Sequence, residues 1–282
     1  MNTFEASELP KSESSARSTL PPRRSDRAAQ ARDSLLDHMQ YGFLKWISPG
    51  EPGCMSGDVY KYKFKIRVLL GDKVLDQLRG KVVIDFGCGE GDDAIALAKG
   101  YALRVIGLDI RESVLERARQ KARQEGVDKV CHFYTSTDER ADAIVSIDSF
   151  EHFSDPASVL MKMSELLKPG GAVFASFGPI WYHPLGGHLF SVFPWAHLIF
   201  SEKALIRWRS NLRSDGATRF GEVDGGLNQM TIARFEKLVK ESPFVLDFLE
   251  AVPIRRLGPL HNRLTREFTT SIVRCKLKLD RR

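Results

Sequence analysis

The segment 82–91, VVIDFGCGEG, constrains the fold of this chain more than any other. Its first three residues are β-branched and apolar, as a buried strand requires, and Asp85 then ends the apolar run. Glycines follow at alternate positions, Gly87, Gly89 and Gly91, where they let the backbone turn tightly and approach a ligand without a clashing Cβ. The segment therefore predicts a strand, a glycine turn and the start of a helix, with a ligand at the turn.

Two classes of cofactor use such a turn. A dinucleotide fold requires G-x-G-x-x-G, with a pyrophosphate at the helix N-terminus. Here the third glycine position is Asp92, and a second acid, Asp93, follows it. Because two carboxylates at a helix N-terminus repel a pyrophosphate, the turn favours a ligand without phosphates and disfavours a nicotinamide enzyme.

Downstream of this segment, strands and helices alternate. Apolar strands are expected at 104–108, 130–134, 142–147 and 172–177, with helices at 111–124 and 157–168. This alternation implies a parallel sheet with right-handed crossovers. Near the end, Thr231 is the expected N-cap of a helix, and segments 244–249 and 271–277 are two further strands, expected to form an antiparallel edge pair.

The N-terminal part of the chain has two regions, which differ in their content of large apolar residues. Residues 1–30 carry almost no large apolar side chains, which predicts a disordered arm. Residues 31–48 have a helical pattern, in which Leu35, Leu36, Met39, Phe43 and Leu44 share one face. In residues 60–67, apolar and basic side chains alternate, as they would in a strand. Apolar side chains also recur every four residues, however, and this spacing continues to Leu78, so we expect a helix.

Composition narrows the class of protein. A chain of 282 residues with 43% hydrophobic content supports one large α/β domain or two small ones. Its four cysteines form no C-x-x-C pair, so we expect no metal and no disulfide framework. The first 30 residues have no apolar core, so no signal peptide is expected, and a cytoplasmic location follows.

The charge is uneven. The net charge is +6, and residues 201–282 hold 17 Lys/Arg against 10 Asp/Glu. A basic end could contact nucleic acid, an anionic membrane or an acidic substrate. An ordinary solvated surface explains it more simply, so no nucleic-acid partner is expected.

Segment 85–91 also matches Asp/Glu-x-Gly-x-Gly-x-Gly, and so resembles motif I of the class I S-adenosylmethionine-dependent methyltransferases. Segment 147–153, IDSFEHF, is similar to the "LEH" segment after strand four of small-molecule "type 11" methyltransferases, including those of quinone biosynthesis, and 167–171, LKPGG, resembles their lead into strand five. The resemblance covers about 80–178. It implies a Rossmann-like, mostly parallel seven-stranded sheet with an antiparallel edge strand.

The resemblance also implies a domain plan and a cofactor site. Lid helices at 31–80 would precede an S-adenosylmethionine-binding domain at 81–282, with an insert at 179–228. Asp109, 24 residues after Asp85 at the end of the second strand, would bind the ribose, and Ile110 would pack on adenine. The full implied set is Asp85, Gly87, Cys88, Gly89, Gly91, Asp109, Ile110, Thr137, Asp138 and Asp148.

Residues 169–201 contain no charged side chain. Their histidines and prolines spoil a transmembrane helix, but a contact with a membrane surface remains open, as does a packed insert that completes the core. Since the segment follows the fifth strand, where the acceptor usually lies in this family, we expect it to line an acceptor pocket. The expected wall residues are Trp181, Tyr182, Phe190 and Trp195, which suit an apolar or aromatic acceptor.

We therefore expect a methyltransferase that acts on a small apolar or aromatic acceptor, at oxygen. A hydroxyl acceptor would release a proton, and His152, His183 and His188 are the candidate bases, with His183 and His188 ahead. Catalysis by positioning alone stays open. So do two other functions: a protein or nucleic-acid methyltransferase that uses the basic C-terminal region, and a non-catalytic binding protein with this fold. The sequence does not indicate an oligomeric state.

Overall fold

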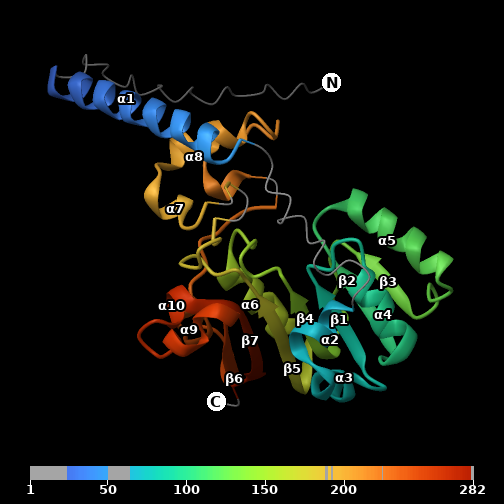
Figure 1. Ribbon diagram of the computed structural model, residues 1–282. Helices are drawn as coiled ribbons and strands as arrows, with labels where there is room; N and C mark the ends of the chain where they lie inside the picture. Colours follow the sequence, from blue (N-terminus) through green and yellow to red (C-terminus); the bar gives the residue numbers. More distant parts are fainter. Residues whose placement is uncertain (1–23, 50–63, 188–189, 192, 224, 281–282) are drawn as a thin grey trace, which may run out of the picture.

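Seven strands form one sheet in the order β3-β2-β1-β4-β5-β7-β6 (Figure 1). The computed structural model describes residues 24–49, 64–187, 190–191, 193–223 and 225–280. The strands are β1 (Val82–Phe86), β2 (Arg104–Leu108), β3 (Cys131–Tyr134), β4 (Ala141–Ile147), β5 (Leu167–Phe177), β6 (Phe244–Pro253) and β7 (Thr270–Leu279). The first five strands are parallel, which confirms the predicted Rossmann-like sheet.

Helices occupy both faces and one end of this sheet (Figure 1). The α-helices are α1 (Arg24–Ile47), α2 (Lys65–Leu70), α3 (Asp72–Leu78), α4 (Asp92–Gly100), α5 (Glu112–Gln124), α6 (Pro156–Leu166), α7 (Ala196–Ile199), α8 (Glu202–Arg209), α9 (Ile232–Lys240) and α10 (Arg266–Thr269). Two 3-10 helices are η3 (Phe220–Glu222) and η4 (Arg255–Leu260). Among the described residues, no helix combines the length and apolar character needed to cross a membrane.

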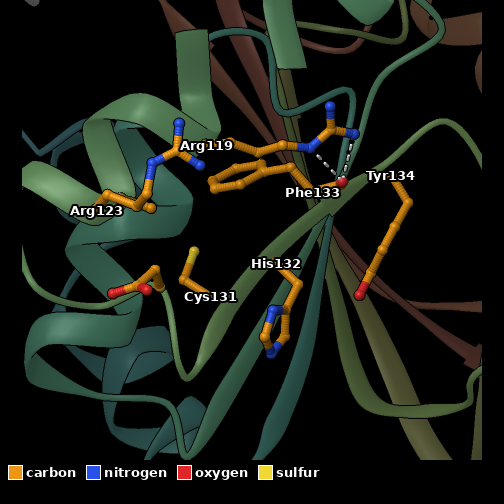
Figure 2. Close-up of a pocket in the computed structure, with 8 residues that line it drawn as sticks. Arg119, Arg123, Cys131, His132, Phe133 and Tyr134 are labelled. Carbon is orange, nitrogen blue, oxygen red and sulfur yellow. Dashed lines mark hydrogen bonds between the residues drawn. The ribbon is translucent and has the colours of Figure 1, made fainter. Parts of the chain in front are cut away.

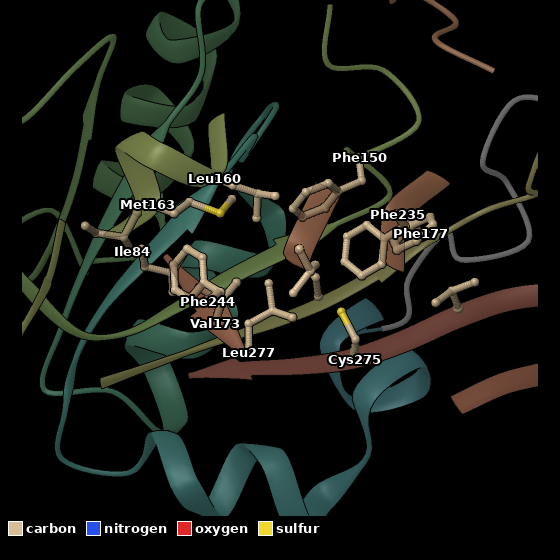
Figure 3. Close-up of a cluster of buried hydrophobic side chains, with 14 of the residues drawn as sticks. Ile84, Phe150, Leu160, Met163, Val173, Phe177, Phe235, Phe244, Cys275 and Leu277 are labelled. Carbon is tan, nitrogen blue, oxygen red and sulfur yellow. The ribbon is translucent and has the colours of Figure 1, made fainter. Parts of the chain in front are cut away.

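The β1 strand shows why the sheet needs apolar residues in unbroken runs. Val83 points into the cluster that α2 to α5 cover, whereas Ile84 points into the cluster on the opposite face, under α6 and α9. Figure 3 shows the second cluster, in which Phe150, Phe177 and Phe235 lie with ring centroids 4.8 to 5.8 Å apart. Both faces of the sheet are therefore buried at its centre, and the carboxyl ends of its strands remain for a site.

A third cluster forms a cap away from the sheet. It joins α1 to the segment that follows β5, and its buried residues are Leu44, Phe190, Ala196, Ala204, Leu205, Trp208, Phe220, Val223 and Leu227. In Figure 1, α1, α7 and α8 lie together above the sheet. We refer to α1 together with residues 190–227 as the cap.

The predicted lid helices at 31–80 do not act as one unit. Of these helices, α1 belongs to the cap, whereas α2 and α3 pack on the sheet through Ile66, Leu69, Leu75 and Leu78. The helical interpretation of segment 60–78 is confirmed for 65–78, but Gly71, at φ 83°, divides it into two helices. Residues 60–63 lie outside the described residues.

The predicted disordered arm at 1–30 is too long, because α1 already begins at Arg24. Segment 24–32, RSDRAAQAR, is poor in large apolar residues but rich in helix-forming Ala, Arg and Gln, a propensity that the composition argument neglected. Residues 1–23 lie outside the described residues, so the rest of that prediction stays a prediction.

At the C-terminal side of the sheet, two details refine the prediction. The antiparallel strand β7 pairs with both β5 and β6, so it lies one place inside the edge and β6 forms the edge itself. The expected turn 167–171 lies within β5, where the pairing register shifts between Ala141–Leu167 and Ala143–Ala172. The five residues thus form an irregular start of the strand.

Candidate functional site

The glycine turn after β1 is packed at two of its glycines and open at the third. A Cβ on Gly87 would lie 2.5 Å from Ser149 Oγ, and one on Gly91 would lie 2.6 Å from the Phe133 ring. A Cβ on Gly89 would meet nothing within 4 Å. All three have positive φ. The outer glycines therefore fit the turn against its neighbours, and the middle one leaves open space where a ligand can approach.

Asp109, at the end of β2, is bound to this turn. Its Oδ2 accepts a hydrogen bond from the Gly89 backbone nitrogen at 3.1 Å, and its Oδ1 accepts from Arg111 N and Nε at 3.0 Å each. Burial would raise the pKa of Asp109, but these hydrogen bonds outweigh it and hold the pKa below its usual value. The carboxylate is thus ionised, and because Arg111 Nη2 also donates to Oδ2 at 3.1 Å, a ligand hydroxyl would have to replace a bond from Arg111.

The pKa of Asp85 is shifted in the opposite direction to that of Asp109. Its side chain is buried, and Oδ2 has no hydrogen-bond partner among the described residues. Burial, together with the nearby charges of Asp93 and Asp109, raises the pKa of Asp85 well above its usual value. A buried carboxylate oxygen without a partner is costly, so it marks a place where a donor group of a ligand would be stabilised.

The end of β4 supplies two more acids. Asp148 has φ 49°, a left-handed conformation that is uncommon outside glycine, and its Oδ2 lies 3.1 Å from Lys65 Nζ. Glu151 is 2% exposed; its Oε1 accepts from Gly178 N at 3.1 Å, and Oε2 has no partner among the described residues. Burial first, and then the charge of Asp148, raises the pKa of Glu151 to about 8.

These acids gather around a single lysine. Asp93, on the first turn of α4, accepts from Ile66 N at 3.4 Å, and burial raises its pKa to about 6. Lys65 is the cation that lowers the pKa of Asp85, Asp93 and Glu151. One ammonium thus faces four carboxyl groups, which include Asp148, and a cationic ligand would be attracted most strongly when these groups are ionised.

The remaining predicted cofactor residues lie around this centre. Cys88 is half-buried, and burial with the charges of Asp85 and Asp109 raises the pKa of its thiol, so it remains a neutral lining group. Ile110 is 91% exposed beside Asp109, an unusual exposure for an isoleucine. Thr137 Oγ1 accepts from the Glu139 amide at 3.2 Å.

Asp138 faces solvent. Its carboxylate lies 3.7 Å from Lys162 Nζ, in an exposed ion pair. None of the described hydrogen bonds joins Thr137 or Asp138 to the glycine turn.

The histidines differ in which ring nitrogen is basic. His152 Nδ1 lies 2.8 Å from the carbonyl oxygen of Gly226; since a carbonyl only accepts, Nδ1 carries the proton and Nε2 is the basic atom. His183 Nδ1 instead accepts from Leu185 N at 2.9 Å, which uses its lone pair and places the ring proton on Nε2. Burial, and then His197, lowers the pKa of His183 to about 4. His188 lies outside the described residues.

The four aromatic residues predicted as pocket walls lie mainly in packed positions. Phe190 is fully buried in the cap, against Phe220 at 4.7 Å between ring centroids. Trp181 contacts Phe220 at 5.5 Å and His197 at 4.5 Å. Tyr182 stacks on Phe268, and Trp195 Nε1 donates to the Tyr182 carbonyl at 3.0 Å. Phe190 and Trp181 thus pack in the cap cluster, whereas Tyr182 packs on Phe268 outside the cap.

Two cavities are described. The first, of about 240 Å³, lies beside β3 and is shown in Figure 2; its lining includes Arg119, Arg123, His132 and Tyr134 but none of the predicted site residues. The Arg119 guanidinium there already donates to the Phe133 carbonyl.

The second cavity, of about 460 Å³, is lined by residues 219–222 and 227–229 together with Glu202. It adjoins the loop after β4, because Asn228 Nδ2 donates to the Phe150 carbonyl at 2.6 Å.

Three residues of this site were missed by the sequence analysis: Lys65, Asp93 as a buried acid, and Glu151. Lys65 is 83 residues from Asp148 in the chain, and nothing near it in the sequence indicates that contact. For Glu151 a signal existed, because it lies within the segment that resembles the family motif, next to His152.

Comparison with known proteins matches part of the chain to one family. The family model described as a methyltransferase domain matches residues 77–178. A ubiquinone biosynthesis O-methyltransferase of Vibrio vulnificus is 37% identical over 127 residues, 42% of this chain and 53% of the relative. One of Coxiella burnetii is 36% identical over 104 residues, 35% of this chain and 44% of the relative. The chain thus spans about half the length of the curated relatives it matches.

A solved structure supports the fold alone. The crystal structure of a Galdieria sulphuraria protein, proposed to be a sarcosine dimethylglycine methyltransferase, superposes with a TM-score of 0.50 at 15% identity. The superposition covers 76% of this chain and 84% of that one.

Proposed function

Since residues 77–178 form a class I S-adenosylmethionine-dependent methyltransferase domain, we propose that this chain transfers a methyl group from that donor to a small apolar or aromatic acceptor, at an oxygen atom. The proposal rests on one observation: a hydrogen bond joins the glycine turn after β1 to Asp109, the acid at the end of β2. Gly89 is open to a ligand, and its own backbone nitrogen holds the Asp109 carboxylate in place. The names of the relatives, ubiquinone biosynthesis O-methyltransferases, support transfer to oxygen.

The residues of the site fit the donor. Asp109 is ionised and can accept the ribose hydroxyls where these replace bonds from Arg111, and Asp85 Oδ2 and Glu151 Oε2, which have no partner among the described residues, would be stabilised by a donor group or positive charge on a ligand. When bound, S-adenosylmethionine supplies a methyl group already activated by its positively charged sulfur. The task left to the protein is to hold the acceptor in line and to exclude water.

The second cavity supports a small acceptor. Its volume of about 460 Å³ lies within the range of small-molecule sites. The loop 226–228 both borders this cavity, through Leu227 and Asn228, and accepts the His152 Nδ1 proton through the Gly226 carbonyl. The cavity and His152 are thus linked through one loop.

We accordingly assign the base to His152 rather than to His183. The Nδ1–H of His152 is held by a carbonyl, which fixes the tautomer that can accept a proton at Nε2. In His183 the lone pair of Nδ1 is already used and the pKa is about 4, so this ring is a poor proton acceptor. His183 is better suited to order the turn at Leu185.

Three basic residues of the C-terminal region form ion pairs within the fold. Arg266 pairs with Glu236 at 2.7 Å, Arg274 with Glu250 at 3.5 Å, and Lys278 with Asp247 at 2.7 Å. These three basic side chains are therefore committed to contacts within the fold, and the excess of Lys/Arg over Asp/Glu in residues 201–282 remains.

Titration calorimetry with S-adenosylmethionine and its demethylated product tests the donor. Mass spectrometry of a panel of phenols and aliphatic alcohols then tests the acceptor class, with products heavier by one methyl group expected for phenols. Absence of cofactor binding would refute the proposal, whereas binding without any methylated product would favour the non-catalytic alternative.

A further inference from the structure

One face of α1 is apolar and exposed. It consists of five large side chains, Leu35, Leu36, Met39, Phe43 and Trp46, whose exposed fractions run from 47% to 77%. At 3.6 residues per turn they fall within a sector of about 100°. Trp46 is the most exposed of them. So many large apolar groups on one sector are more than the scattered exposure of an ordinary surface.

The exposure is a fixed feature, because the neighbouring face of α1 is bound to α8. Asp37 Oδ1 accepts from Ser201 Oγ at 2.5 Å, and Gln40 Oε1 accepts from Ser201 N at 2.7 Å. Leu44 is fully buried between the two helices. These contacts set the rotation of α1 about its axis, and α1 lies beside α8 in Figure 1.

The apolar sector continues onto α7. The Phe43 ring lies 6.1 Å from the Phe200 ring, and Phe200 lies 6.3 Å from Phe193. On α7 itself, Leu198 and Ile199 are 41% and 56% exposed. This part comes from the segment 169–201, which has no charged residue. We call the five α1 residues together with Phe193, Leu198 and Ile199 the apolar patch.

We propose that the apolar patch docks the protein on the surface of an anionic phospholipid bilayer. Leu, Met, Phe and Trp on one side of a helix, with a tryptophan at its end, are the residues that lie at the boundary of headgroups and acyl chains. The chain carries a net charge of +6, which attracts it to an anionic membrane but repels a second copy of the same chain. Charge thus selects the bilayer over self-association. The proposal does not depend on methyl transfer.

The test is flotation of the full chain with vesicles of phosphatidylcholine mixed with phosphatidylglycerol, against vesicles of phosphatidylcholine alone. We expect binding to the anionic vesicles and a blue shift of tryptophan fluorescence, which Trp46→Phe should remove. A triple variant, Leu36→Ser, Met39→Ser and Trp46→Ser, should lower the partition coefficient by at least about tenfold.

A matched control makes the same chemical change elsewhere. Leu260 and Leu264 are 61% and 91% exposed outside the patch, and their change to Ser should leave vesicle binding unaltered. Circular dichroism and cofactor titration of both variants check that they fold.

The proposal is overturned if the full chain fails to float with anionic vesicles, or if the patch and control variants bind them equally. It is also overturned if the wild-type chain sediments as a dimer that the triple variant converts to monomer, because the patch would then be an interface between two copies.

Discussion

Asp109 Oδ2 accepts a hydrogen bond from the backbone nitrogen of Gly89 at 3.1 Å, so the acid that ends β2 and the turn that follows β1 form one unit. Neither group can move without the other. Any ligand that contacts the carboxylate also lies beside the open position at Gly89. Substitutions of Asp109 and of Gly89 should therefore both affect binding of the same ligand.

Replacing Asp109 by Ala should weaken binding of S-adenosylmethionine by about 1.5–3 kcal/mol, because a hydrogen bond to a charged acceptor is lost. Titration calorimetry measures this change. Asp128→Ala, which removes an exposed carboxylate outside the proposed site, serves as the control and should bind normally. Equal affinities in the two variants would remove Asp109 from the site.

Substitutions of two glycines in the turn should affect different properties: Gly91→Ala mainly the stability of the fold, and Gly89→Ala mainly cofactor binding. In Gly91→Ala the new Cβ meets the Phe133 ring at 2.6 Å and Ala118 Cβ at 2.9 Å, so we expect a loss of roughly 2 kcal/mol or more of unfolding free energy. Gly89→Ala meets nothing within 4 Å and should cost about 1–2 kcal/mol through its positive φ alone, yet abolish measurable cofactor binding. Urea unfolding and calorimetry together measure both effects. Normal binding by a folded Gly89→Ala protein would contradict the assignment.

His152→Ala should lower turnover by about 10²–10⁴-fold and remove the acid limb of the pH–rate profile, because the proton acceptor is lost. His183→Ala should retain that limb, since its Nδ1 lone pair already accepts from Leu185. The measurement is the rate of methyl transfer across about pH 5 to 9, with cofactor affinity determined separately. If these two variants and His188→Ala all kept wild-type profiles, positioning alone would carry the reaction.

Glu151 should make the protein less stable as the pH rises. Its pKa is raised to about 8 in the folded state, so the folded protein binds a proton that the unfolded chain releases near the ordinary value of 4.5. The folded state therefore loses stability between about pH 4.5 and 8, and Asp85 and Asp93 act in the same direction. Glu151→Gln should flatten this slope and stabilise the protein at pH 8 by on the order of 1–3 kcal/mol. Thermal unfolding at several pH values decides this; an unchanged slope in Glu151→Gln would show that the carboxyl is ionised when folded.

The sequence predicts what short-range chemistry determines. The bounds of β2, 104–108, agree with the structure, and Thr231 does cap α9, with its Oγ1 accepting from Arg234 N at 3.0 Å. Each depends on a few neighbouring residues. In contrast, the contact of Lys65 with Asp148 spans 83 residues and requires the finished fold.

Phe190 shows another limit. An apolar aromatic residue serves equally well in a pocket wall and in a core, so its residue type could not show that it fills the cap. Only the position of its packing partner Phe220, in a distant part of the chain, decides between them.

The cap also determines the order in which the chain can fold. Trp208 Nε1 donates to the Ser48 carbonyl at 2.7 Å across 160 residues, and Ser201 reaches Asp37 across 164. On the ribosome, α1 emerges before any strand of the sheet, yet the residues that bind it emerge only after β5. Contacts of such long range form slowly, because a large loop must close first. The helix that leads the chain is thus among the last to dock, and its apolar residues, including Leu44, stay accessible to chaperones during synthesis.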